Sequence, residues 1–137
     1  MSAMSYDRAD YDLAKYTVRI AFFVTWAMLS GLAGEMHLED DQELLAKLYQ
    51  REVTPGHFFT VACDCKFWEA DLNAEGNRFA RDYYMHHCTQ DGYFEDYARV
   101  LLAEYGELES VVDCWANYDK IAPVIAVHYE RWKNGSK

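Results

Sequence analysis

The sequence has few cysteines and few basic residues, and each shortage excludes a class of protein. Four irregularly spaced cysteines in 137 residues are too few for a disulfide framework, so we expect reduced, mostly buried thiols. Thirteen Lys and Arg against 23 Asp and Glu give a net charge of -10, which repels a phosphate backbone or an anionic membrane surface. We therefore expect no direct nucleic-acid binding and no membrane binding. The acidity either attracts a cationic partner or serves solubility alone.

Long apolar runs are also missing. The longest candidate, between Arg19 and Glu35, holds fifteen uncharged residues, whereas a membrane helix needs about 20 apolar ones. Met1 to Asp12 carries acids and no apolar run, so it does not resemble a secretory signal. Together these features predict a cytoplasmic protein.

Helical periodicity dominates what remains, and no run alternates with period two for long enough to predict a sheet. The predicted fold class is all-α, with a single domain over residues 1–137. It is a bundle of five to six helices around a buried first long helix, and residues 1–10 and 134–137 are expected to be flexible. Pro123 predicts a kink, or a join of two helices, near Ile121. The expected helices are Leu13 to Ala33, Asp40 to Gln50, Pro55 to Ala62 after Thr54, an Asn73-capped helix to Cys88, Tyr93 to Glu104, and a last helix carrying Trp115 to Trp132.

The residues that could bind a metal or catalyse a reaction have spacings that fit no known site. Cys63 and Cys65 are separated by one residue, and His86 and His87 point about 100° apart on a helix, whereas structural zinc sites pair ligands two to four residues apart. Glu-x-x-His motifs, nucleophile triads and phosphate loops are absent from the sequence. We expect no metal, no cofactor and no catalytic residue. The alternative is a small helical enzyme or ligand-binding regulator that uses His57, Asp64, Asp71 or His86.

Acidic residues are concentrated in two stretches. Five acids and no Lys or Arg lie between Glu35 and Glu43, and seven acids with the single base Arg99 lie between Asp91 and Asp113. Each stretch is either a cation-facing surface or a solvated face. Four tyrosines lie beside the predicted inner stripes and are candidate interface anchors, namely Tyr49, Tyr84, Tyr93 and Tyr105. The residues we predict to bind a partner are Glu39, Asp40, Asp41, Asp91, Tyr93, Glu95, Glu104 and Tyr105.

A set of residues spread over nearly the whole chain carries a family resemblance. The set comprises Ala21-Phe22-Phe23-Val24-Thr25-Trp26, Gly31-Leu32, Thr54-Pro55, Asp71-Leu72-Asn73-Ala74-Glu75-Gly76, Phe79, Tyr83-Tyr84, Tyr93, Asp96-Tyr97, Trp115, Tyr118 and Trp132. With these residues the chain resembles a family of uncharacterised bacterial proteins, several of which are encoded beside polymorphic or contact-delivered toxins and look like their immunity proteins. Members carry a Trp-His pair and a proline-rich loop before the first helix, whereas here Tyr11 to Tyr16 runs in directly. The resemblance implies no catalytic residue.

Resemblance and acidity together predict an immunity protein, or antitoxin, that binds and occludes a cognate bacterial toxin. A toxin that acts on nucleic acid or a nucleotide often presents a basic active-site cleft, which an acidic helical protein can cover by charge complementarity. An acidic rim would speed association, and a desolvated aromatic anchor would slow dissociation. The enzyme or regulator alternative requires a concave pocket lined by perturbed carboxylates or histidines.

Overall fold

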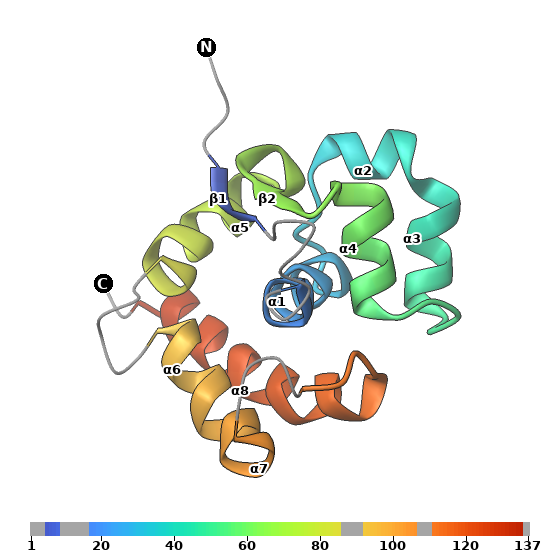
Figure 1. Cartoon of the computed structure of the whole chain (residues 1–137). Helices are drawn as coiled ribbons and strands as arrows, with labels where there is room; N and C mark the ends of the chain where they lie inside the picture. The colour runs from blue at the N-terminus through green and yellow to red at the C-terminus, as the bar shows by residue number, and fades with distance from the viewer. Residues whose placement is uncertain (1–4, 9–16, 86–91, 107–110, 136–137) are drawn as a thin grey trace.

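The computed structural model describes residues 5–8, 17–85, 92–106 and 111–135. At its centre lies α1 (Thr17–Leu29), in which all ten residues from Arg19 to Met28 are buried. A helix that is apolar on every side must be covered on every side, and Figure 1 shows α1 nearly end-on with the other helices around it. The all-α single domain around a buried first helix is therefore confirmed. Within the described residues, no helix has the length and apolar character needed to cross a membrane.

Two groups of helices flank α1, one on each side, and a shorter set of elements completes the cover (Figure 1). The first group is α2 (Glu35–Asp40), α3 (Gln42–Tyr49) and α4 (Pro55–Cys63). The second is α6 (Tyr93–Tyr97), η4 (Ala98–Leu102), α7 (Ala103–Tyr105) and α8 (Trp115–Lys133). The shorter set comprises β1 (Ser5–Arg8) near the N-terminus and the segment between α4 and α6. This segment forms β2 (Lys66–Trp68), the short turn η2 (Glu69–Asp71), α5 (Ala74–Phe79) and η3 (Ala80–Tyr84).

Local sequence signals explain where two of these helices begin. The hydroxyl oxygen of Thr54 accepts a hydrogen bond from the backbone N–H of His57 at 3.2 Å, and Pro55 opens α4 as predicted. The side-chain oxygen of Asn73 accepts from the N–H of Gly76 at 2.8 Å, which caps α5. Both caps satisfy backbone donors that a helix start leaves free.

Three features differ from the sequence-based prediction. The acidic stretch forms the separate helix α2, so the predicted second helix is reduced to α3. Helix α8 runs unbroken through Pro123, so a join of two helices there is wrong. Strand β1 pairs antiparallel with β2, a ribbon that we did not expect because strands of three or four residues are too short to show alternation. Most of the ends expected to be flexible lie outside the described residues.

Aromatic side chains fill the space around α1. Phe23 is 1% exposed and lies among six other rings. These rings belong to Trp26, Phe67, Phe79, Tyr83, Tyr84 and Tyr93, with centroids 4.9 to 6.2 Å from that of Phe23. Tyr84 and Tyr93, which we expected near the surface, are fully buried and stack on each other. Core packing therefore accounts for both residues.

Candidate functional site

The acidic stretch from Asp91 to Asp113 offers little unpaired charge where the structure describes it. Asp91 itself lies outside the described residues. Glu104 is exposed, but its carboxylate pairs with the Lys120 ammonium at 2.6 Å. Glu95 is exposed on α6. Of the two predicted carboxylates that the structure describes in this stretch, Glu104 has a cation beside it and Glu95 does not.

The two tyrosines predicted as anchors on this side both have partners within the domain. Tyr93 is fully buried, and its hydroxyl donates to the backbone carbonyl of Arg19. Its predicted role as a partner contact is wrong, because the ring belongs to the core. Tyr105 is half-buried, and its hydroxyl exchanges hydrogen bonds with the side-chain amide of Asn117 at 3.0 and 3.2 Å.

Asp96, which also lies in this stretch, is the centre of a buried network. Its Oδ2 accepts from the Tyr83 hydroxyl at 2.5 Å and lies 3.0 Å from His128 Nε2, and its Oδ1 pairs with Arg99. The carboxylate is fully buried. These contacts tie η3, α6 and α8 together, so Asp96 holds the fold rather than facing a partner.

The stretch from Glu35 to Glu43 presents a different surface. Four of its carboxylates are exposed and, among the described residues, form no ion pair. Two apolar side chains lie in the same segment, Met36 with 38% and Leu38 with 50% of their surface exposed. We call this surface, on α2 and the start of α3, the acidic face; it comprises Glu35, Met36, Leu38, Glu39, Asp40 and Glu43.

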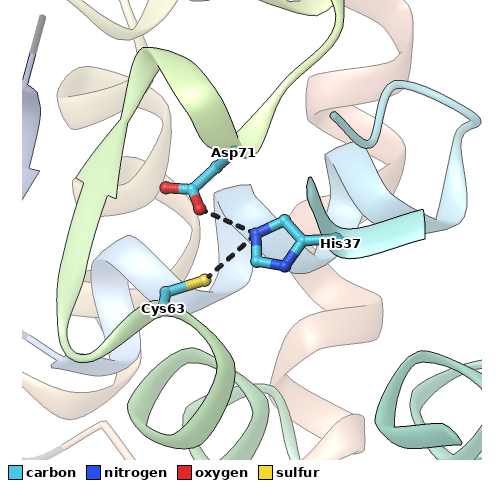
Figure 2. A group of neighbouring side chains, drawn as sticks. All are labelled: His37, Cys63 and Asp71. Atoms are coloured by element: carbon cyan, nitrogen blue, oxygen red, sulfur yellow. Dashed lines mark hydrogen bonds and ion pairs between the residues drawn. The ribbon is translucent and has the colours of Figure 1, made fainter. Parts of the chain in front are cut away.

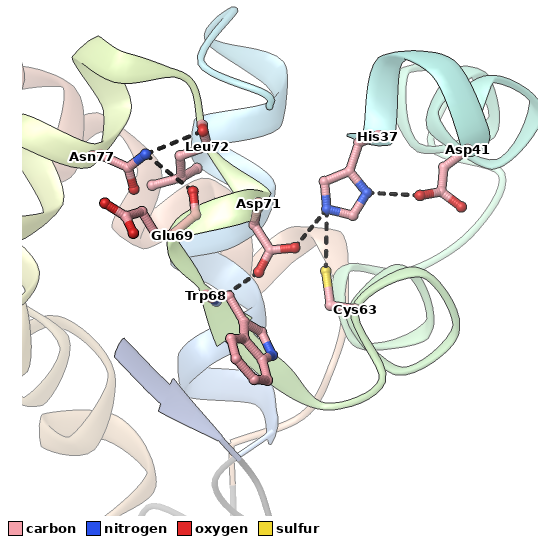
Figure 3. Close-up of polar contacts among 8 residues, drawn as sticks. All are labelled: His37, Asp41, Cys63, Trp68, Glu69, Asp71, Leu72 and Asn77. Atoms are coloured by element: carbon pink, nitrogen blue, oxygen red, sulfur yellow. Dashed lines mark hydrogen bonds and ion pairs between the residues drawn. The ribbon is translucent and has the colours of Figure 1, made fainter. Parts of the chain in front are cut away.

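His37 lies on the buried side of α2, between two carboxylates. Its Nδ1 lies 2.8 Å from Asp41 Oδ2, and its Nε2 lies 2.7 Å from Asp71 Oδ1 (Figure 3). Asp71 is itself fixed, because its other oxygen accepts from the backbone N–H of Trp68 at 2.7 Å. The Sγ atom of Cys63, at the end of α4, lies 3.8 Å from His37 Nε2 (Figure 2). Three separate segments thus converge on one imidazole ring.

A glycine lets α2 approach η2 closely enough for these contacts. The N–H of Gly34, just before α2, donates to the Asp71 carbonyl at 2.9 Å. A Cβ atom on Gly34 would lie 2.4 Å from the Ala70 carbonyl oxygen, closer than real Cβ atoms come. The absence of a Cβ atom at this position therefore permits the close approach that brings His37 to Asp71.

The surroundings of the cluster shift two pKa values. Burial is the largest effect on His37 and lowers its pKa, but the hydrogen bonds to Asp71 and Asp41 and the charges of both carboxylates together raise the pKa above 6.5. Burial, followed by the charge of Asp71, raises the pKa of the Cys63 thiol far above its usual range. The protonated imidazole and the protonated thiol are thus favoured, and Cys63 lacks the thiolate that a nucleophile needs.

A pocket of about 220 Å³ leads to the cluster. It is lined by Met36, Ala62, Cys63, Asp64, Trp68, Ala70 and Asp71. Two of the residues named for an enzyme, Asp64 and Asp71, therefore lie at this pocket. His57 is instead exposed on α4, and His86 lies outside the described residues.

His37 was not among the predicted site residues, because its partners are distant in sequence. Cys63 stands close to Cys65 in sequence, but in the structure it meets a histidine 26 positions away. A usable signal was the spacing of four between His37 and Asp41, which places both on one face of a helix.

The family comparison covers most of the chain. Residues 5–112 match the model of a family described as "Domain of unknown function (DUF7832)", and the chain belongs to this family. No curated protein and no solved structure matches the chain. The match includes the acidic face and the His37 cluster, but the family's description names no activity, toxin or partner.

Proposed function

We propose that this protein is an immunity protein that binds a cognate toxin through the acidic face and covers the toxin's basic active-site surface. The observation that carries the proposal is a group of four exposed carboxylates, without ion pairs among the described residues, in the same segment as two exposed apolar side chains. The family resemblance drawn from the sequence supports the choice of a toxin as partner.

The contrast between the two acidic stretches favours this face. The carboxylates of Asp96 and Glu104 are already paired with cations of the same domain, so a partner would gain little from them. On the acidic face, a partner's lysines or arginines would meet exposed carboxylates that form no ion pair within the described part of the chain. Such a rim speeds encounter with a basic surface and makes the rate depend on salt.

Met36 and Leu38 provide apolar contacts, which charge complementarity alone does not. Interface energy comes mostly from a few side chains that lose water completely, surrounded by a polar rim. Met36 also lines the pocket of about 220 Å³ that Asp64 and Asp71 share. Met36 therefore lies where the acidic face meets this pocket.

The direct test is protection. The chain is expressed together with each toxin domain encoded beside its gene, in cells that the toxin alone kills, and binding is measured with the purified pair. Survival and a one-to-one complex are expected for one of these toxins. If the chain neither protects against nor binds any of the adjacent toxins, the immunity proposal is wrong.

Charge reversal then locates the surface. Glu39→Lys with Asp40→Lys should slow association and reduce its salt dependence. The control is Glu95→Lys with Glu104→Lys, which changes the net charge by the same amount on the other stretch. Asp41 is left unchanged, because it contacts His37 and its loss would disturb the cluster. If the control pair slows association and the first pair does not, the acidic face is the wrong surface.

A further inference from the structure

Three potential metal ligands from distant parts of the chain point at one another. His37 on α2, Cys63 at the end of α4 and Asp71 at the end of η2 each place one ligand atom within 4.8 Å of the other two (Figure 2). All three side chains are buried. We propose that His37, Cys63 and Asp71 bind one divalent transition-metal ion, for which Zn²⁺ is the best match, through Nε2, Sγ and Oδ1, and that the ion displaces the protons that Nε2 and Sγ carry in the metal-free protein.

The ligand types select this class of ion. Thiolate, imidazole and carboxylate together are the donors of zinc sites, whereas magnesium and calcium prefer oxygen alone. With zinc bonds of about 2.0 to 2.3 Å, ligand atoms in a tetrahedral site lie roughly 3 to 4 Å apart. The distance from Cys63 Sγ to His37 Nε2 is 3.8 Å, and the distance from His37 Nε2 to Asp71 Oδ1 is 2.7 Å. Asp71 Oδ1 and His37 Nε2 must move apart to admit the ion, since 2.7 Å is shorter than the separation of two ligand atoms in such a site.

Two further groups hold the ligands in the orientation that a metal requires. Asp41 Oδ2 lies 2.8 Å from Nδ1 of His37, which leaves Nε2 as the ligand atom and fixes the ring (Figure 3). The backbone N–H of Trp68 holds the second oxygen of Asp71. A histidine that donates its other N–H to a carboxylate is the usual outer arrangement of a zinc site. Asp41 is therefore a positioning residue in this proposal.

The pocket of about 220 Å³ supplies the route to the site and room for a fourth ligand. Cys63 and Asp71 both line it, so an ion can reach them without unfolding the domain. Three protein ligands with an open fourth position describe a site that keeps a water or accepts a small ligand. The ligands lie on the buried side of α2 and the charges of the acidic face lie on its exposed side, so the metal titration tests this inference separately from the proposed immunity function.

The experiment is a metal titration of tag-free protein that has first been stripped with a chelator. Co²⁺ is added first, because a cobalt–thiolate bond gives a charge-transfer band in the near ultraviolet and tetrahedral cobalt gives ligand-field bands in the visible. One Co²⁺ per chain, with both signals, is expected, and Zn²⁺ should displace it. Mg²⁺ should neither bind nor displace. A wild-type protein that shows neither signal at saturating Co²⁺ would overturn the proposal.

Variants identify the ligands. Cys63→Ser should abolish the charge-transfer band, whereas Cys65→Ser and Cys114→Ser should keep it, since neither thiol belongs to the cluster. Asp41→Asn keeps all three ligands and should weaken Zn²⁺ affinity about 10- to 100-fold. This milder change keeps the test decisive if Cys63→Ser does not fold. Unchanged affinity in Asp41→Asn, or a band lost in Cys65→Ser, would place any ion elsewhere and contradict the assignment.

Discussion

His37 and Asp71 lie 34 positions apart in sequence and meet through a 2.7 Å contact in the domain interior. Asp71 belongs to η2, and His37 belongs to the helix whose opposite side carries the acidic face. The contact therefore fastens the proposed binding surface to the rest of the fold. A short helix such as α2, with six residues, has little stability of its own and depends on such contacts.

The first prediction concerns pH. In the metal-free protein, the pKa of His37 is raised above 6.5 by Asp71 and Asp41 despite burial. A group whose pKa is higher in the folded than in the unfolded state stabilises the fold. This contribution is complete at pH values below the unfolded-state pKa and is lost as pH rises through the folded-state pKa. Stability should therefore fall as pH rises above about 6.5, the ordinary pKa of histidine. The ordinary pKa of the Cys63 thiol, 9.0, is higher, so a fall that begins near neutral pH does not come from the thiol.

Urea unfolding in the presence of a chelator measures this pH dependence. His37→Gln should be less stable at the acidic end and should lose most of the slope. His57→Gln is the control, because His57 is exposed on α4 and lies outside the cluster. An identical slope in His37→Gln and in the wild type would mean that other groups cause it.

The second prediction concerns the close approach of α2 to η2. Gly34→Ala places a methyl group 2.4 Å from the Ala70 carbonyl oxygen, so one of the two segments must move. We expect a loss of about 1 to 3 kcal/mol, typical of overpacking, and weaker Co²⁺ binding because His37 moves with α2. Ser30 is exposed and directly follows α1, so Ser30→Ala should change the free energy of unfolding by no more than about 0.5 kcal/mol. Unchanged stability in Gly34→Ala would mean that the segments separate freely.

The sequence predicted the central helix and the helix starts because these depend on local chemistry. The apolar faces of α1, the Thr54-Pro55 start and the Asn73 cap are each contained within a few residues. The cluster around His37 depends instead on three segments that meet only after folding. Its histidine stands among acids in the sequence, and the spacing of four to Asp41 indicates a shared helix face but not that this face is buried.

The error at Tyr93 has a similar cause. Its position beside the inner stripe of a predicted helix indicated partial exposure. In the structure Tyr93 and Tyr97, one turn apart on α6, are both buried, and Tyr93 stacks on Tyr84 with ring centroids 5.3 Å apart. Tyr84 belongs to η3, so this contact forms only on folding, and periodicity within one helix does not predict it.

The third prediction tests the aromatic core. Trp26 is 5% exposed and packs edge-on against Tyr129 with centroids 5.2 Å apart. Trp26→Ala leaves a large cavity and should cost about 3 to 5 kcal/mol in the free energy of unfolding. Val61→Ala, at a position 60% exposed on α4, should cost within about 0.5 kcal/mol. Denaturant unfolding followed by circular dichroism compares them, and equal stability of the two variants would contradict the packing described for α1.

The last prediction separates the two parts of the acidic face. Charge reversals there should act mainly on the association rate with the toxin, because rim charges steer encounter. Leu38 is 50% exposed in the free protein and should lose its water on binding. Leu38→Ala should therefore raise the dissociation rate about tenfold or more, with little change in association rate and salt dependence. Val127→Ala is the matched control, because Val127 is 48% exposed on α8 and should leave both rates unchanged. Surface-capture kinetics with the purified toxin measures both rates. If Leu38→Ala and Val127→Ala dissociate equally slowly, the apolar part of the acidic face does not anchor the complex, and electrostatic attraction alone must account for its lifetime.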